Sequence, residues 1–206
     1  METQARRVAV GMKLLCGAQV AALLRAIPVD TLRAAATVLM FGLALWGLCL
    51  AAPCGRGFRR AGWALAGWAV LTLVPVGTVL ALERLPEGQG LWLTNLYLAS
   101  EPLGELAWCA VPVLALSAAA GQVENGEWVR AAGRFGKLLL GWTVALTALG
   151  LVSVACGTVG GPLAGRLSVW LLSVILAGEI VALLLNVAAA VLLWRGGGLL
   201  VGRARG

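Results

Sequence analysis

Residues 167–194 read LSVWLLSVILAGEIVALLLNVAAAVLLW, and this stretch decides the class of fold. Its 28 residues include one charged side chain, Glu179, and no proline. As a helix it is about 42 Å long, which exceeds the roughly 30 Å thickness of the hydrocarbon core of a bilayer. The stretch therefore predicts a transmembrane helix that tilts or extends beyond the membrane.

The rest of the chain has the same apolar character. Its 206 residues are 61% hydrophobic and 12% charged, with a mean hydropathy of +0.93, whereas soluble domains are about 25% charged. Helices are the spanning structures that satisfy their own backbone polar groups in lipid. We therefore predict an all-α, polytopic transmembrane helix bundle. Residues 1–206 form one domain with candidate spans 8–27, 33–52, 61–82, 103–120, 138–158 and 167–194.

The first candidate span, 8–27, has three interpretations because it contains Lys13, Gln19 and Arg25. A surface helix needs its charges on one face, and these scatter around the helix. A signal peptide needs an uninterrupted apolar region, which Lys13 breaks. A spanning helix with Lys13 and Arg25 reaching opposite interfaces fits better. If this segment does not cross, the bundle has five spans.

The basic residues favour six spans and predict an orientation. With six spans, 12 of the 16 lysines and arginines lie on one side; with five, the division is nine to seven. The positive-inside rule favours the unequal division. We therefore expect a multi-pass protein of the cell (inner or plasma) membrane with cytoplasmic N and C termini. The net charge of +7 then predicts membrane lipids, including anionic headgroups, as partners, and no nucleic acid.

An offset of 74 residues relates two pairs of predicted spans, which indicates a tandem helix-hairpin repeat. Shared residues occur in both helices of each pair: Arg60, Gly62, Leu65, Gly67, Trp68 and Val70 align with Arg134, Gly136, Leu139, Gly141, Trp142 and Val144, and Gly104-Glu105-Leu106 aligns with Gly178-Glu179-Ile180. A third, degenerate copy begins at Lys13. The alternative is that helices rich in Leu, Ala, Gly and Val align easily by chance.

Glu105, Glu179 and Asn186 are the candidate intramembrane polar site. Each glutamate lies 15 residues before the inner end of its span, at Ala120 or Trp194, which is about 22 Å of helix. We therefore expect the two carboxyls at similar depth, with Asn186 on nearly the same face as Glu179. Such carboxyls are costly in lipid and usually face the bundle interior or a cavity. If they meet, they form a proton or cation site; otherwise each extends to the outer interface or hydrogen-bonds a neighbouring helix.

Two connecting segments have alternative interpretations. Residues 121–134 mix both charge signs, and Arg130 and Arg134 are candidate contacts for a cytoplasmic partner. This segment is either a solvated linker or a short amphipathic helix. Residues 91–100 are apolar but too short to span, so they lie in the interface or extend the next span outward. Gly196-Gly197-Gly198 is typical of a loop.

The sequence favours a protein that is not an enzyme. It has no histidine, the commonest general base and metal ligand, and no phosphate-binding loop or C-x-x-C pair. We expect no catalytic residues, metal or cofactor, and we interpret the five cysteines as small packing residues. The alternative is a membrane-embedded lipid-modifying enzyme that uses Glu, Asp30, Ser or Cys.

The pattern Asn125-x3-Val129-Arg130-x2-Gly133 before a span resembles an uncharacterised family of small bacterial four-helix membrane proteins, a domain of unknown function. Residues 176–180 resemble its last helix. The phenylalanine that usually precedes the asparagine and the usual acidic tail are both missing here. Members often accompany small helix-turn-helix regulators, so the resemblance, which covers the C-terminal half, implies an accessory role.

Together these features predict a non-enzymatic accessory or regulatory membrane subunit, in a homo-oligomer or a larger membrane complex. The absence of a soluble domain and of catalytic motifs motivates this prediction. The alternative is a small carrier or channel in which Glu105 and Glu179 bind a proton, a cation or a substrate.

Overall fold

The computed structural model describes the whole chain except residues 1, 26, 28, 85–89, 160–161 and 204–206. The described residues form six α-helices and one short 3-10 helix, without strands. Each α-helix is long and apolar enough to cross a membrane. The protein is therefore an all-α, multi-pass membrane protein, as the sequence predicts.

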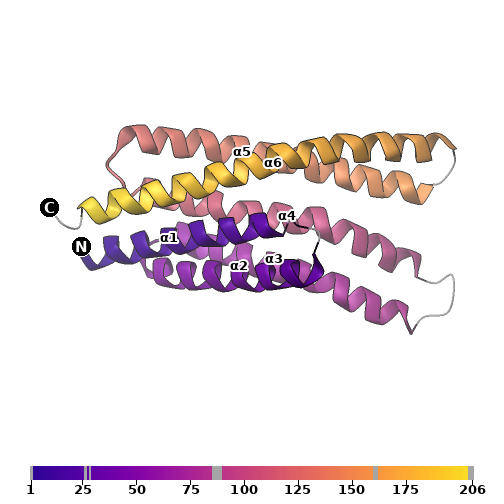
Figure 1. Cartoon of the computed structure of the whole chain (residues 1–206), viewed down its shortest axis with the longest axis horizontal. Coiled ribbons are helices and arrows are strands. Elements are labelled where there is room, and N and C mark those ends of the chain that lie inside the picture. The colour runs from indigo at the N-terminus through magenta and orange to yellow at the C-terminus, as the bar shows by residue number, and fades with distance from the viewer. Residues whose placement is uncertain (1, 26, 28, 85–89, 160–161, 204–206) are drawn as a thin grey trace.

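Successive helices run antiparallel, so both termini lie at the same end of the bundle (Figure 1). We call this end the base and the opposite end the tip. The base also contains the turn at residues 121–125 and the 3-10 helix, which are joined by a 3.1 Å hydrogen bond from Gln122 Nε2 to the Cys54 carbonyl. The helices are α1 (Glu2–Leu24), α2 (Asp30–Ala51), η1 (Ala52–Cys54), α3 (Arg56–Leu82), α4 (Leu91–Ala120), α5 (Gly126–Val159) and α6 (Pro162–Arg203).

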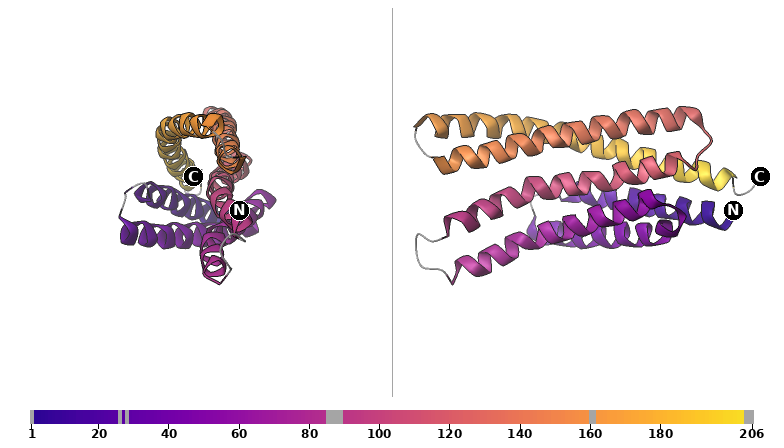
Figure 2. Two further views of the ribbon diagram at one scale, coloured as in Figure 1. Left: turned by 90° about the vertical axis from the view of Figure 1, so that its right-hand side faces the viewer. Right: turned by 180° about the vertical axis from the view of Figure 1, so that it is seen from behind.

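The helices form a closed bundle, because α1 packs against α6 as well as against α2. Helices α3, α4, α5 and α6 also pack in order, and α4 touches both α1 and α6. Figure 2 shows the α3–α4 and α5–α6 hairpins side by side and diverging toward the tip. The first predicted span is thus part of the bundle, with a helix that ends at Leu24.

The three hairpins differ in length. Helices α1 and α2 have 23 and 22 residues, whereas α5 and α6 have 34 and 42. At 1.5 Å per residue, α1 is about 35 Å long and α6 about 63 Å. The α1–α2 hairpin therefore ends partway along the bundle, and the other two hairpins extend past it toward the tip (Figure 1).

Three segments that the sequence places outside the spans are helical extensions of them. Residues 91–100 form the first turns of α4, which agrees with one of the two interpretations. Residues 126–134 begin α5, so they are neither a linker nor a separate helix. The prediction of a loop at Gly196–Gly198 is wrong, because α6 continues through these residues.

Glycines and alanines let the helices approach closely at the base. A Cβ placed on Gly47 would lie 2.7 Å from the Gly11 carbonyl oxygen, so α1 and α2 cross with backbones almost in contact. A Cβ on Gly197 would lie 3.0 Å from the Ala9 carbonyl oxygen of α1. Small residues at such crossings are the usual means of packing membrane helices, and they explain why glycines persist inside α6.

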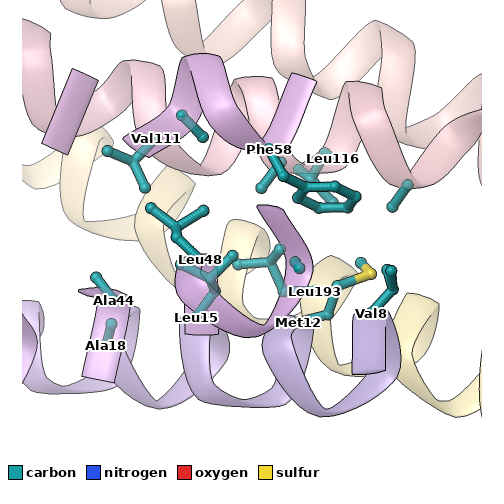
Figure 3. Packing of buried hydrophobic residues seen from close by; sticks show 14 of the residues in the cluster. Val8, Met12, Leu15, Ala18, Ala44, Leu48, Phe58, Val111, Leu116 and Leu193 are labelled. Carbon is teal, nitrogen blue, oxygen red and sulfur yellow. The ribbon is translucent and has the colours of Figure 1, made fainter. Parts of the chain in front are cut away.

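Large apolar side chains fill the space between these crossings. Met12, Phe58, Leu116 and Leu193, from α1, α3, α4 and α6, are all fully buried. Figure 3 shows these side chains in one cluster with neighbours from α2. The base is therefore a close-packed core shared by most of the bundle.

Candidate functional site

Glu105 forms an ion pair with Arg25. The Nη1 atom of Arg25 lies 3.2 Å from Oε1 of Glu105, and the two side chains are 26% and 43% exposed. Arg25 directly follows the last residue of α1, whereas Glu105 lies in the middle of α4. The pair therefore joins the end of the short hairpin to the longer α3–α4 hairpin.

The guanidinium of Arg25 lies over one ring of an aromatic cluster. Its Cζ atom lies 5.9 Å from the ring centroid of Trp68, within cation–π distance. The Trp68 ring lies 5.6 Å from that of Trp108 and 6.0 Å from that of Phe41. Trp68 and Trp108 are 3% and 2% exposed. Arg25 is thus held between a carboxylate and a buried aromatic cluster.

Three buried polar atoms have no hydrogen-bond partner among the described residues: Gln19 Oε1, Arg25 Nε and Trp108 Nε1. Gln19 is 1% exposed, and it lies on α1 one and a half turns before Arg25. An unsatisfied buried polar atom costs about 1–3 kcal/mol. The region around Arg25 therefore contains more hydrogen-bonding capacity than the described side chains use.

Glu179 lies near this region but is arranged differently. It is exposed on α6, and it makes no hydrogen bond or ion pair with the described residues. Gly178, the residue before Glu179, accepts a hydrogen bond from Trp142 of α5, and Pro102, three residues before Glu105 on α4, accepts one from Thr147 of α5. Among the described residues, Arg25 forms its ion pair with Glu105 and not with Glu179.

The third predicted member, Asn186, bonds to its own helix. Its Nδ2 atom donates a 3.0 Å hydrogen bond to the Ala182 carbonyl of its own helix. The side chain is thus satisfied locally. The structure thus places Glu105 on α4 and Glu179 on α6, both beside α5, with the Asn186 amide bonded to its own helix.

The predicted cytoplasmic contacts, Arg130 and Arg134, are both exposed on the first turns of α5 at the base. The turn before them is fixed by Asn125, whose Oδ1 accepts a 2.9 Å hydrogen bond from the Trp128 amide. This is an N-cap, which asparagine favours. Trp128 Nε1 then donates a 3.2 Å hydrogen bond to the Leu192 carbonyl of α6, so the start of α5 is held against the bundle.

Sequence reasoning missed Arg25 as part of the site, because it expected this arginine to extend to the outer interface. The available signal was a basic residue near the end of an apolar block, with glutamates in other blocks as candidate partners. The geometry differs from the expectation because the α1–α2 hairpin is short. The end of α1 consequently lies beside the middle of α4.

Two open surface pockets lie away from the glutamates. One is at the base, between α1 and α2, and the other is near the tip, between α3 and α4, lined by Gly77, Leu80, Ala81, Arg84, Trp92 and Leu93. In the described part of the chain, no group of three or more Cys, Asp or Glu residues could hold a metal ion. The chemistry that Arg25 and Glu105 show is charge pairing and hydrogen bonding.

No protein-family model, curated protein or solved structure matches this chain. Its class is defined by the fold and the site alone: a six-helix, multi-pass membrane protein with an arginine–glutamate pair between its first and second hairpins.

Proposed function

We propose that the protein is a non-enzymatic accessory or regulatory subunit of a membrane complex. The observation that carries this proposal is the state of Glu179, which is exposed on α6 and has no bonded partner among the described residues. A carboxylate on the lipid-facing side of a membrane helix is costly unless another group meets it. Arg25 does not meet it, since that arginine is bonded to Glu105.

The surface around Glu179 suits a second membrane helix. Leu172, Leu176, Ile180 and Leu183 are 54%, 61%, 65% and 41% exposed. Their spacing places them on the same side of α6 as Glu179. A partner helix that covers this face and donates a hydrogen bond to the carboxylate would remove the cost of exposing it. Residues 125–133 and 176–180 resemble an uncharacterised family whose members often accompany small helix-turn-helix regulators, and this resemblance implies the same role.

Photo-crosslinking in native membranes tests the accessory role. A benzoylphenylalanine at Leu176 should give a discrete protein adduct, and the additional change Glu179→Gln should weaken it. The same probe at Val38 of α2, which is 73% exposed, is the matched control and should give no discrete adduct. Equal products at both positions, or no adduct from Leu176, would reject the proposal.

We propose a small carrier or channel as the second candidate, with Glu105 and Glu179 as its proton, cation or substrate site. The position of both glutamates beside α5 favours it, since Gly178 accepts a hydrogen bond from Trp142 and Pro102 accepts one from Thr147. Proteoliposomes that contain only this chain should then conduct protons or cations. The double variant Glu105→Gln/Glu179→Gln should abolish that flux. Unchanged flux in the double variant would remove the site, and an impermeable wild type would remove the function.

We also propose that the base faces the cytoplasm. Arg56, Arg59 and Arg60 begin α3 at this end, and Arg130, Arg134 and Lys137 begin α5. Lysine and arginine gather on the cytoplasmic side of membrane proteins. The proposed orientation, with both termini in the cytoplasm, follows from this distribution of basic residues.

A further inference from the structure

The α3–α4 hairpin shows how this fold holds a guanidinium between its helices. Arg25, at the end of α1, lies 3.2 Å from the Glu105 carboxylate and 5.9 Å from the ring centroid of Trp68. The carboxylate and the ring belong to facing turns, because Gly104 lies against Leu71, three residues after Trp68. Arginine suits this pair of contacts, since its planar guanidinium both pairs with carboxylates and stacks on aromatic rings.

The α5–α6 hairpin has the same two groups at facing turns. Trp142 Nε1 of α5 donates a 3.2 Å hydrogen bond to the carbonyl of Gly178, the residue before Glu179 on α6. Gly178 also lies against Leu146, four residues after Trp142. An indole ring and the backbone that carries a glutamate therefore lie side by side in this hairpin as well.

The two hairpins differ in what covers these groups. Trp68 is 3% exposed, because Phe41 of α2 stacks on it and Arg25 lies over it. Trp142 is half-buried and Glu179 is exposed. Among the described residues, no arginine or lysine forms an ion pair with Glu179. This hairpin thus presents a carboxylate and a partly accessible ring for which the described part of the chain supplies no guanidinium.

We propose that the partner subunit carries an arginine in its transmembrane helix, and that its guanidinium pairs with Glu179 and stacks on Trp142. This inference rests on the proposed accessory role and adds the chemistry of the partner. Charge complementarity selects this occupant, because charged side chains inside a membrane pair with one another, whereas a wholly apolar helix leaves the carboxylate unpaired. A lysine could meet the charge, but its compact ammonium lacks the planar surface that stacks on the ring.

Apolar side chains border the two groups on both helices. Leu176 and Leu183 lie three residues before and four residues after Glu179, so they share its side of α6, and both are exposed. Leu138 lies four residues before Trp142 on α5 and is also exposed. A transmembrane helix can therefore pack on this surface while its arginine reaches the carboxylate and the ring.

The photo-crosslinking probe at Leu176 tests the partner's chemistry when the captured peptide is sequenced. The peptide should contain an arginine, and Glu179→Gln should lower the adduct yield at least fivefold, on the order expected for loss of a charge-assisted bond. Glu127→Gln removes the same charge from the base end of α5. It is the matched control and should change the yield by less than about twofold.

A charge exchange tests the pair directly. Glu179→Arg should abolish the adduct, because two guanidinium groups then meet in the membrane. Changing the captured arginine to glutamate in the partner should restore it. If the exchanged pair gives no adduct although both proteins insert, the proposal is wrong.

Two substitutions at Trp142 test the ring without a change of charge. Trp142→Phe and Trp142→Leu both remove the indole hydrogen bond, and only the first keeps an aromatic face. The adduct yield from the leucine variant should be about threefold lower than that from the phenylalanine variant. Equal yields from the two variants would overturn the stacking contact.

The outcomes separate this inference from the accessory role on which it rests. A captured peptide without arginine, a captured second copy of this chain, or a yield that Glu179→Gln leaves unchanged would overturn the inference. In each case the adduct from Leu176 is still formed. Absence of any adduct from the wild-type surface would instead reject the accessory role, and this inference with it.

Discussion

Different interactions hold the helices together at the base and at the tip of the bundle. At the base, helices cross at glycines and bury large apolar side chains such as Phe58 and Met12. The residues that α5 and α6 contribute to the cores, including Trp128, Ala132 and Leu193, lie in this half. Toward the tip the hairpins diverge, and many large apolar side chains of α5 and α6 are exposed.

This difference indicates that the helices of the base stay associated through their own packing, whereas those of the tip depend more on contacts with their surroundings. In lipid, apolar exposure costs nothing, so a membrane helix needs close packing or polar bonds to stay associated. The base has the close packing. The tip half relies on a few polar contacts, such as the 3.1 Å hydrogen bond from Thr147 Oγ1 to the Pro102 carbonyl. A partner is therefore more readily accommodated toward the tip.

The largest expected effect comes from filling a helix crossing at the base. Gly47→Leu should destabilise the fold by about 3 kcal/mol or more, because the side chain has no space beside the Gly11 carbonyl. Gly42→Leu on the same helix meets nothing within 4 Å and should be nearly neutral. Thermal unfolding in nanodiscs measures both. Equal stability of the two variants would show that the base is not close-packed.

The ion pair between the two halves should give the next largest effect. Arg25→Gln should cost about 1–2 kcal/mol, less than a fully buried pair, because both side chains are partly exposed. Glu105→Gln in the same chain should recover part of the loss, since no unpaired carboxylate then remains. A double-mutant cycle on the unfolding free energy measures the coupling. Additive effects would mean that the pair does not join the hairpins.

Two tryptophans allow the halves to be compared by the same substitution. Trp128→Phe should cost about 1.5 kcal/mol, because it removes a hydrogen bond to Leu192 and packing against Gly196 in the base. Trp142→Phe removes only a 3.2 Å bond to the Gly178 carbonyl from a half-buried ring, and should cost about 0.6 kcal/mol. Unfolding curves of both variants give the two losses of unfolding free energy and hence their ratio. A larger loss at Trp142 would reverse the comparison.

The sequence was sufficient for the class of fold, because block length and hydropathy reflect bilayer thickness directly. It was insufficient for the ends of helices. Residues 91–100, 126–134 and 195–203 continue their spans as helix, and the length of an apolar block does not define where its helix begins and ends. Gly196 looked like a loop signal because its role, making room for the Trp128 ring and Met12, depends on the tertiary contact.

Part of the candidate site could also be predicted from the sequence. Charged residues in apolar blocks indicated Glu105 and Glu179, since their cost in lipid requires an explanation. The pairing of Glu105 with Arg25 depends on the relative lengths of two hairpins, which composition does not define. The sequence did not indicate that Asn186 bonds to its own helix, because such a bond is as accessible as one to a neighbour.

The 74-residue repeat stays a prediction. One pattern of contacts agrees with it. Gly104 faces Leu71 of α3, and Gly178 faces Leu146 of α5, so each glycine lies against the preceding helix of its hairpin. The equivalent tryptophans differ, since Trp142 bonds α6 whereas Trp68 packs on Trp108 and Arg25. Repeated hairpins with divergent contacts would account for both observations.

Cysteine labelling in intact cells tests the six-span arrangement most directly. In a chain whose five cysteines are replaced, single cysteines at Thr3, Glu127 and Arg84 would report the start of α1, the start of α5 and the end of α3. A membrane-impermeant maleimide should label only position 84 until the cells are permeabilised, when positions 3 and 127 should react. Labelling of position 3 from outside, with position 127 still protected, would mean that the first helix does not cross and would contradict the account.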